Sequence, residues 1–313
     1  MRRAAYHRRV APTDFVAGVD LGATNLRIAI AGLDGEIVAR RAGRADLRRP
    51  PEDALRGIRR EVDDLLRGVW PGAKLRAIGM GLPGIVDPGT GTVASPANLP
   101  GWGAVPVARL LSGDDGVPVA VENDANIAAI GERWRGAAKS WRTFVFVALG
   151  TGIGAGVVVD GRLHRGAHFF AGELAYLPTD RAHVRGPFEA DAGLEGEAGG
   201  RAIGPRLSRM LGRDVTTEEA FRLAREGDPA AAAVIRDVQE HLAVALSAVA
   251  AILDPDGIVV GGGMSSQGEF LLGPVREMLH RQVPTKPPLV VSELGEDAQL
   301  LGAIRAALDR CGD

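Results

Sequence analysis

The chain has 313 residues, 46% of them hydrophobic, which is enough to bury a sizeable core and favours two domains over one. Its net charge of −2 excludes a strongly basic surface for nucleic acid or for an anionic membrane, and no apolar run reaches the roughly 20 residues that span a bilayer. The basic start lacks the apolar stretch of a signal peptide, so we expect a soluble cytoplasmic protein. The only cysteine, Cys311, excludes an internal disulfide and a cysteine-built metal site.

Strand and helix patterns alternate along the chain, which is typical of an α/β fold. We interpret residues 1–13 as a loose basic tail, and we expect Trp102 to pack in a core. The elements predicted in the first half are strands at 15–19, 26–31, 36–39, 77–80 and 117–121, an amphipathic helix at 52–68, and a glycine- and proline-rich loop at 81–106.

The second half repeats the opening order of the first. An apolar strand at 143–149 enters a glycine turn, a second strand follows at 155–159, and an Asp-Gly pair then turns the chain again. Because Gly22 and Gly152 lie about 130 residues apart in matching units, the repetition predicts two related domains. The remaining predicted elements are helices at 197–211, 216–226, 229–253 and 297–309 and a strand at 258–260.

Two glycine turns, Asp20–Asn25 and Gly150–Gly154, join paired strands. Without a Cβ the backbone can approach a polyanion closely, and its N–H groups can point at the phosphate oxygens. Asp20 would repel phosphate unless a cation intervened, which predicts Mg²⁺ held by Asp20 directly or through water. Neither turn is a Walker loop or a dinucleotide fingerprint, and either one alone more often indicates a plain hairpin.

Asp124 lies between the predicted strand 117–121 and a helical pattern that begins at Ile127. The positive end of a helix keeps such a carboxylate ionised, so it can accept the proton of a hydroxyl. An N-cap that accepts a backbone hydrogen bond is the alternative, and the spacing alone favours the cap.

Four segments combine these features: Gly18–Asn25, Glu122–Asn126, Gly150–Gly156 and Val259–Gly263. In order and spacing they resemble the ROK family of repressors, open reading frames and kinases, which includes bacterial glucokinases. The resemblance extends from about residue 14 to 310. It implies an α/β fold of duplicated actin-like, ribonuclease-H-like domains with ATP in an interdomain cleft.

We place the smaller N-terminal domain at 14–122, with the helix at 297–310 packed back on it, and the larger C-terminal domain at 123–296. The resemblance implies an ATP-dependent kinase that phosphorylates a hexose, glucose or a related sugar, at its 6-hydroxyl, with Asp124 as the general base. It also implies a homodimer that binds sugar and ATP, with no nucleic acid or membrane as partner.

The resemblance also implies the ligands, residue by residue. The ATP and phosphate contacts are Asp20, Gly22, Ala23, Thr24, Asn25, Thr151, Gly152, Gly261, Gly262, Gly263 and Met264, with Asp20 also at the Mg²⁺. The sugar contacts are Gly84, Asn98, Asn123, Asp124, Glu173, Tyr176 and Glu195.

The zinc segment of the family is altered in this chain. In the family, a Gly-Glu-x-Gly-His segment and a Cys-x-Cys-Gly-x-x-Gly-Cys-x-Glu segment supply one histidine and three cysteines to a structural Zn²⁺ and two glutamates to the sugar. Here the glutamates remain as Glu173 and Glu195, whereas the zinc ligands are replaced by Tyr176, Gly186, Phe188 and Gly193. Zinc requires thiolates or imidazoles, so we predict no zinc; His164 and His168 are interpreted as surface or turn residues.

Tyr176 leaves two outcomes open: sugar binding with a changed preference, or a filled site in a weakly active or non-catalytic sugar sensor. Glu173 and Glu195 favour retained sugar binding. We expect no role as a DNA-binding repressor, because only about 13 residues precede the first strand. A kinase that uses polyphosphate is a further alternative, against which stands the adenosine-like segment Gly261–Met264. The preferred sugar stays open.

Overall fold

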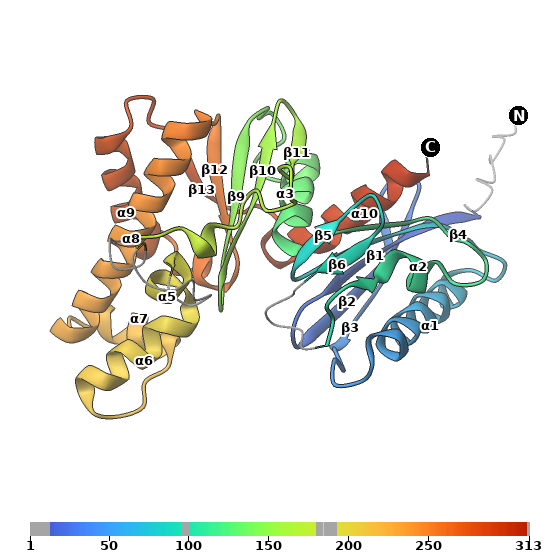
Figure 1. The fold of residues 1–313 in the computed structure, drawn as a ribbon, viewed down its shortest axis with the longest axis horizontal. Coiled ribbons are helices and arrows are strands. Elements are labelled where there is room, and N and C mark those ends of the chain that lie inside the picture. Colours follow the sequence, from blue (N-terminus) through green and yellow to red (C-terminus); the bar gives the residue numbers. More distant parts are fainter. Residues whose placement is uncertain (1–12, 95–100, 180–183, 185–192, 312–313) are drawn as a thin grey trace, which may run out of the picture. The chain divides into compact units, whose positions relative to one another are not determined.

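The computed structural model describes residues 13–94, 101–179, 184 and 193–311. The chain divides into two compact units: unit 1 comprises residues 1–123 and 303–313, and unit 2 comprises residues 124–302. Each unit is built around its own five-stranded sheet (Figure 1). Within the described part of the chain, no helix has the length and apolar character needed to cross a membrane.

The sheet of unit 1 has the strand order β3-β2-β1-β4-β8. The first three strands in the chain are antiparallel neighbours, whereas β4 is parallel to β1 and β8 is parallel to β4. The bounds of these strands are β1 (Asp14–Leu21), β2 (Asn25–Gly32), β3 (Ile37–Arg44), β4 (Lys74–Leu82) and β8 (Val119–Asn123).

Helix α1 (Pro51–Val69) covers one face of this sheet together with α2 (Val107–Ser112). The predicted amphipathic stripe is confirmed, because the buried residues of α1 recur every three or four positions. Proline at the first turn and Glu52 with Asp53 beside it suit a helix N-terminus. Trp102 is fully buried in the same core, as predicted.

The sheet of unit 2 has the order β11-β10-β9-β12-β13, which repeats the topology of unit 1 strand for strand. The same three strands are antiparallel and the same two are parallel, so the predicted duplication is confirmed at the level of topology. Asp160 and Gly161 both have positive φ at the predicted hairpin turn. The bounds are β9 (Phe144–Leu149), β10 (Ile153–Val159), β11 (Arg162–His164), β12 (Gly257–Gly261) and β13 (Leu289–Val291).

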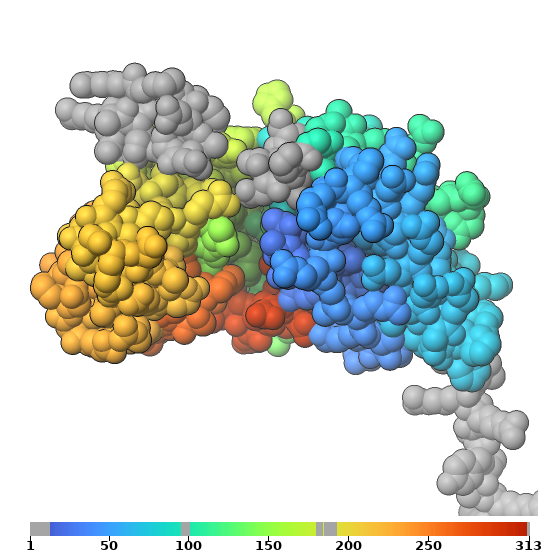
Figure 2. All heavy atoms as spheres, turned by 90° about the horizontal axis from the view of Figure 1, so that it is seen from below, coloured from blue at the N-terminus to red at the C-terminus, as the bar shows by residue number. Residues whose placement is uncertain are grey.

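Helices cover both faces of the second sheet (Figure 1). Helices α5 to α9 pack on one face, and α3 packs on the other with the start of α10. Figure 2 shows yellow-to-orange atoms, the colours of α5 to α9, over much of the surface of unit 2 in that view. The bounds are α3 (Asp124–Arg135), η1 (Leu174–Tyr176), α5 (Leu194–Ala198), α6 (Gly200–Leu211), α7 (Thr217–Arg225), α8 (Pro229–Leu253), η2 (Gly263–Gln267), α9 (Glu269–Gln282), η3 (Gly295–Asp297) and α10 (Ala298–Arg310).

Two local expectations are wrong, and further elements were not predicted. The segment 81–106 is not only loop, because it contains a small antiparallel sheet of β5 (Ile85–Asp87), β6 (Thr92–Ala94) and β7 (Val105–Pro106). The helix expected at 197–211 is two helices, since Gly199 has extended backbone between α5 and α6. Helix α9 and strand β13 were not predicted at all. Strands of two or three residues are too short to show a period in the sequence.

Helices α3 and α10 approach each other through glycine. A Cβ at Gly302 would lie 1.7 Å from the carbonyl oxygen of Ile127, and one at Gly131 would lie 2.2 Å from that of Ala298. The two backbones therefore touch in unit 2, and any larger residue at either position must force them apart.

We expect Gly302→Ala to lower the free energy of unfolding by at least about 2 kcal/mol, because overpacking against rigid backbone is not relieved by a rotamer change. Denaturant unfolding measures this. Gly57→Ala in α1 is the matched control, since a Cβ there meets nothing within 4 Å. The control should be neutral or stabilising by up to about 1 kcal/mol. Equal effects of the two substitutions would contradict the close approach.

Candidate active site

The first glycine turn joins β1 to β2 in unit 1. The Gly22 amide donates to the Asn25 carbonyl (2.8 Å), and the Thr24 carbonyl accepts a hydrogen bond from the Ala45 amide (3.0 Å). Ala23, Thr24 and Asn25 are exposed. Gly22, Ala23, Thr24 and Asn25, four of the five residues predicted as phosphate contacts in this motif, therefore form the turn itself, and Asp20 precedes it.

An open pocket of about 850 Å³ borders this turn. Ala23 and Thr24 line it on one side, and the end of β3 with the following segment contributes Arg44 and Arg48. Arg44 lies opposite Asn25 in the sheet, and within the described ranges it has no ion-pair partner. A guanidinium beside exposed backbone amides suits a phosphate group. Sequence reasoning missed both arginines, because the β2–β3 register brings Arg44 to the turn and the segment after β3 brings Arg48.

Asp20 lies at the end of β1 and is only 7% exposed. Its Oδ2 accepts a hydrogen bond from Arg27 Nε (2.8 Å) and forms an ion pair with a terminal nitrogen of the same guanidinium (2.7 Å). Burial raises the pKa of Asp20, and the charge and hydrogen bond of Arg27 oppose that effect. Among the described residues Oδ1 has no partner, so this oxygen fits a Mg²⁺ ion or its bound water. Arg27 was not anticipated, because the pairing depends on the β1–β2 hairpin.

The predicted sugar contacts of unit 1 are partly brought together. The Asn123 side-chain amide donates to the Gly84 carbonyl (3.1 Å), which joins the end of β8 to the turn after β4. Gly84 has φ +118°, a conformation that favours glycine. Asn98 lies outside the described residues.

Asp124 is the first residue of α3 and is half-buried. Its Oδ1 accepts a hydrogen bond from the Ala125 amide (2.8 Å). The contact holds one carboxylate oxygen of Asp124 at the start of the helix. The strand–helix junction positions the carboxylate firmly because Ala125 to Ala129 are all buried.

Glu173 lies just before η1 and shares unit 2 with two other predicted carboxylates. Burial raises the pKa of Glu173 to about 7, and the negative charges of Asp124 and Glu195 raise it in the same direction. Asp124 and Glu195 therefore both lie near Glu173 in unit 2, and we call these three residues the carboxylate cluster. Near neutral pH Glu173 is present in both forms, and the protonated form can donate a hydrogen bond to a sugar oxygen.

The raised pKa of Glu173 predicts a pH-dependent stability. An unfolded glutamate ionises near 4.5, whereas the folded one ionises near 7, so the folded protein binds more protons between these values and loses stability as the pH rises through them. Glu173→Gln mimics the neutral acid. We expect it to raise the free energy of unfolding by about 1–3 kcal/mol at about pH 8.5 and to change little at about pH 4.

Denaturant unfolding at the two pH values measures this difference. Glu218→Gln, on the exposed side of α7, is the control and should change neither value. If wild type and Glu173→Gln gave parallel stability curves, the raised pKa would be wrong.

The segment that carries Glu173 and Tyr176 is fixed by backbone contacts. A Cβ at Gly172 would lie 2.1 Å from the Ala155 carbonyl oxygen, and one at Gly193 would lie 2.3 Å from that of Ala175. The rings of Tyr176 and Phe170 pack at 5.4 Å between centroids. Of the four positions that replace zinc ligands, Tyr176 and Gly193 are therefore packed into the local structure, and Gly186 and Phe188 lie outside the described residues.

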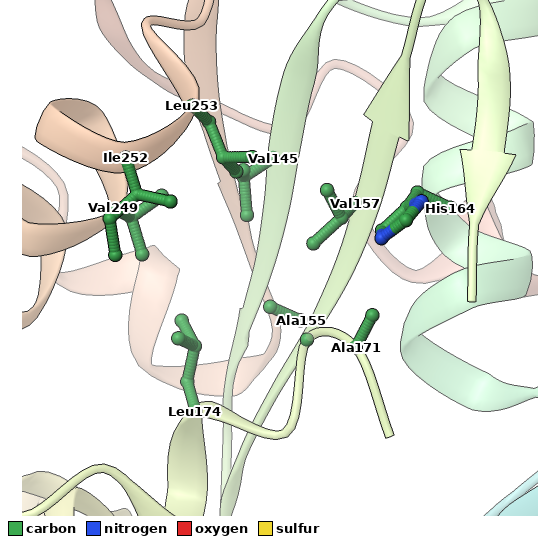
Figure 3. A pocket seen from close by; sticks show the side chains of 10 residues that line it. Val145, Ala155, Val157, His164, Ala171, Leu174, Val249, Ile252 and Leu253 are labelled. Carbon is green, nitrogen blue, oxygen red and sulfur yellow. The ribbon is translucent and has the colours of Figure 1, made fainter. Parts of the chain in front are cut away.

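An apolar pocket of about 190 Å³ lies behind this segment (Figure 3). Gly172 and Leu174, on either side of Glu173, line it with Val157 of β10 and Ile252 of α8. His164 of β11 borders it and is exposed, as predicted for a surface histidine; His168 lies in an exposed turn. His164 is the one titratable residue among the described residues that line it.

The second glycine turn joins β9 to β10 in unit 2. The first amides of α6 donate to it, from Gly200 to the Gly150 carbonyl and from Arg201 to the Thr151 carbonyl, both at 2.9 Å. The Ile153 amide donates to Oε2 of Glu195 in α5 (2.8 Å). In the part of the chain that the structure describes, the amides of Thr151 and Gly152 donate to no acceptor and remain available to an anion.

The segment predicted to line adenosine follows β12. Gly262 and Gly263 are exposed, and Gly262 has φ +84° with its backbone against Leu149. Gly261 and Met264 are instead buried, Gly261 against the Phe146 ring and Met264 in the core of unit 2. Gly262 and Gly263 are therefore accessible to a ligand, whereas Gly261 and Met264 pack in the interior beneath them.

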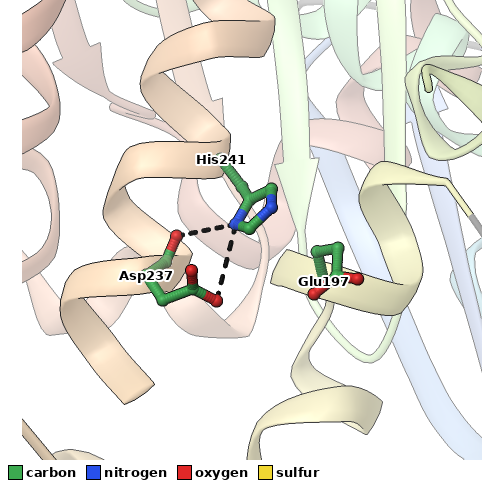
Figure 4. Close-up of side chains that lie close together, drawn as sticks. All are labelled: Glu197, Asp237 and His241. Atoms are coloured by element: carbon green, nitrogen blue, oxygen red, sulfur yellow. Dashed lines mark hydrogen bonds and ion pairs between the residues drawn. The ribbon is translucent and has the colours of Figure 1, made fainter. Parts of the chain in front are cut away.

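Glu197, Asp237 and His241 bring possible metal ligands within 4.8 Å of one another (Figure 4). His241 Nδ1 lies 2.9 Å from the Asp237 carbonyl oxygen, one helical turn earlier in α8. Arg206 already forms ion pairs with both carboxylates. A metal ion would have to displace this guanidinium, so we interpret the cluster as an ion-pair network between α5, α6 and α8.

Comparisons with known proteins agree with this geometry. A model of the ROK family matches residues 16–310. The chain is 32% identical to a glucokinase of Thermotoga maritima, over 94% of this chain and 98% of that protein. It is 28% identical to a putative xylose repressor of a Caldicellulosiruptor species, over 92% of this chain and 77% of that protein.

Solved structures of ROK family proteins are similar to this chain in fold. A ROK hexokinase from Thermus thermophilus superposes with a TM-score of 0.83 at 31% identity, over 96% of this chain and 99% of that one. A ROK family glucokinase from Streptomyces griseus, in complex with glucose and AMPPNP, superposes with a TM-score of 0.76 at 27% identity, over 94% and 99%.

Proposed function

The chain belongs to the ROK family, and from this premise we propose that it transfers the γ-phosphate of ATP to the 6-hydroxyl of a hexose, glucose or a related sugar. The observation that carries the proposal is the carboxylate cluster of unit 2. Asp124 begins α3 with one oxygen held by a backbone amide, and its charge and that of Glu195 both act on Glu173, a carboxylate suited to sugar hydroxyls. Glucokinase relatives support sugar phosphorylation as the general activity.

In the proposed reaction Asp124 accepts the proton of the attacking hydroxyl, whose oxygen forms the new bond to the γ-phosphorus as the bond to ADP breaks. Glu173 and Glu195 orient the sugar through its other hydroxyls. Asn123, held against the Gly84 carbonyl, contributes a further polar contact. Correct placement of the hydroxyl is the larger part of what these residues supply.

The phosphates of ATP are bound, in this proposal, by the two glycine turns and by Arg44 beside the first of them. Asp20 is the residue that would hold Mg²⁺, which when bound neutralises phosphate charge. The complex of the Streptomyces griseus relative with glucose and AMPPNP supports ATP as the donor. Gly262 and Gly263 are the exposed candidates for the adenosine contact.

One panel tests the proposal: coupled ADP release from Mg-ATP with glucose, mannose, fructose, N-acetylated hexosamines and no sugar, and a second set with polyphosphate as the donor. We expect sugar-dependent turnover with ATP and little without sugar. Turnover with polyphosphate alone would mean that polyphosphate, and not ATP, is the phosphate donor. Saturable sugar binding without turnover would favour the second candidate function, a sugar sensor. The similarity to repressors and the presence of Tyr176 support this alternative.

We extend the proposal to the absence of a structural zinc. Tyr176 packs on Phe170, and Gly193 lies against Ala175, so two of the altered positions are occupied by contacts that leave no place for a thiolate or imidazole. We expect elemental analysis of the purified protein to find less than about 0.1 zinc per chain, far below the one ion that a structural site requires. Stoichiometric zinc would show that other residues bind it.

A further inference from the structure

Glu195 faces two kinds of ligand at once. It belongs to the carboxylate cluster with Asp124 and Glu173, and it also reaches the glycine turn between β9 and β10. Its Oε2 accepts the Ile153 amide at 2.8 Å, whereas no described residue hydrogen-bonds to Oε1. The Glu195 side chain therefore connects the carboxylate cluster of unit 2 to the glycine turn between β9 and β10.

Gly152 shows how closely the carboxylate fits the turn. A Cβ at Gly152 would lie 2.2 Å from Oε2 of Glu195 and 2.9 Å from its carboxyl carbon. No positive φ explains this glycine, so space for the carboxylate is the reason that the position lacks a side chain. The turn and the side chain of Glu195 are complementary.

The turn is also held from its carbonyl side. The first two amides of α6 donate to Gly150 and Thr151, and α6 follows directly after α5, which carries Glu195. With two carbonyls and the Ile153 amide fixed in this way, the amides of Thr151 and Gly152 keep one orientation. Preorganised amides bind an anion better than amides that must first be ordered.

We propose that Glu195 is a positioning residue for the phosphate-binding turn Gly150–Ile153: Oε2 holds the turn in shape, and Oε1 is left for a sugar hydroxyl. The inference rests on the proposed function, because it assumes that the turn binds phosphate. It adds a consequence that a plain sugar contact does not have, namely that a change at Glu195 weakens the binding of nucleotide.

The test compares Glu195→Ala with Glu195→Gln, since glutamine keeps an oxygen that can accept the Ile153 amide. We expect Glu195→Ala to raise KM for ATP about fivefold, in line with the loss of one typical hydrogen bond, and Glu195→Gln to restore most of it. Glu197→Gln, two residues further along α5, is the matched control and should leave KM for ATP within about twofold.

A double mutant isolates the contact. Gly152→Ala should weaken ATP binding by pushing the carboxylate away, and it should add little when Glu195 is already alanine. Additive effects would mean that the methyl group introduced by Gly152→Ala acts on the phosphate directly, and they would count against the proposed contact between Glu195 and the turn.

Two readouts do not need turnover: amide hydrogen exchange at Ile153, and calorimetric binding of a non-hydrolysable ATP analogue with Mg²⁺. Exchange at Ile153 should accelerate about tenfold in Glu195→Ala and not in Glu195→Gln. These readouts remain valid if wild type turns over no sugar, so the two proposals can fail separately. Unchanged exchange, unchanged nucleotide affinity with only the sugar KM raised, or tighter nucleotide binding in Glu195→Ala would each overturn the proposal.

Discussion

Asp124→Asn is expected to lower kcat by at least about 1,000-fold, because an amide cannot take the proton of the attacking hydroxyl. Asparagine keeps the size of the side chain and an oxygen that can accept the Ala125 amide, so the start of α3 should stay intact. Coupled ADP release measures the rate. The KM values and the melting temperature should change little, because asparagine can still form hydrogen bonds to the sugar and to the Ala125 amide.

Asp228→Asn is the matched control for this substitution. Asp228 caps α8 by accepting the Ala231 amide at 2.8 Å, in a role that resembles the capping alternative for Asp124. If Asp124 were only a cap, the two variants would behave alike and both would retain full activity. A large loss of kcat in Asp124→Asn alone assigns the residue to the chemistry.

Asp20→Asn is expected to lower kcat about 100-fold and to raise the Mg²⁺ concentration needed for half-maximal activity. The substitution removes the anionic oxygen that fits a hard cation. The fold should tolerate it, because the Arg27 side chain is 26% exposed and water can solvate its charge. Titration of activity and of nucleotide binding against Mg²⁺ measures both effects.

The control for Asp20→Asn is Asp63→Asn in α1. Asp63 also pairs with an arginine, Arg59, but it lies on a helix rather than at a glycine turn. It should leave the Mg²⁺ dependence unchanged. An unaltered Mg²⁺ dependence in Asp20→Asn would mean that Asp20 does not bind the metal ion and serves only as the ion-pair partner of Arg27.

The sequence predicted the repeated strand units well because both signals are local. Apolar runs followed by glycine and Asp-Gly turns specify hairpins without reference to the rest of the chain. The bounds of α8 were predicted at 229–253 because Asp228 caps it and a proline begins it. The break at Gly199 was missed because a glycine within a helical pattern does not by itself show a change of backbone direction.

The partners of the site residues were harder to predict, since they depend on contacts between distant segments. Arg27 reaches Asp20 across a hairpin, and Arg44 reaches the first turn through the β2–β3 register. Glu195 reaches Ile153 from a helix 42 residues away in the chain. Motif spacing identified which carboxylates to examine, and only the structure shows which amide or guanidinium each one meets.

The most direct measurement of the central claim is ³¹P NMR of the products formed from Mg-ATP and each hexose, with wild type and with Asp124→Asn. For wild type we predict ADP together with a sugar phosphate ester at the 6-position, and for the variant unchanged ATP over the same time. Absence of a phosphate ester with every sugar, or an equal yield from Asp124→Asn, would contradict the account.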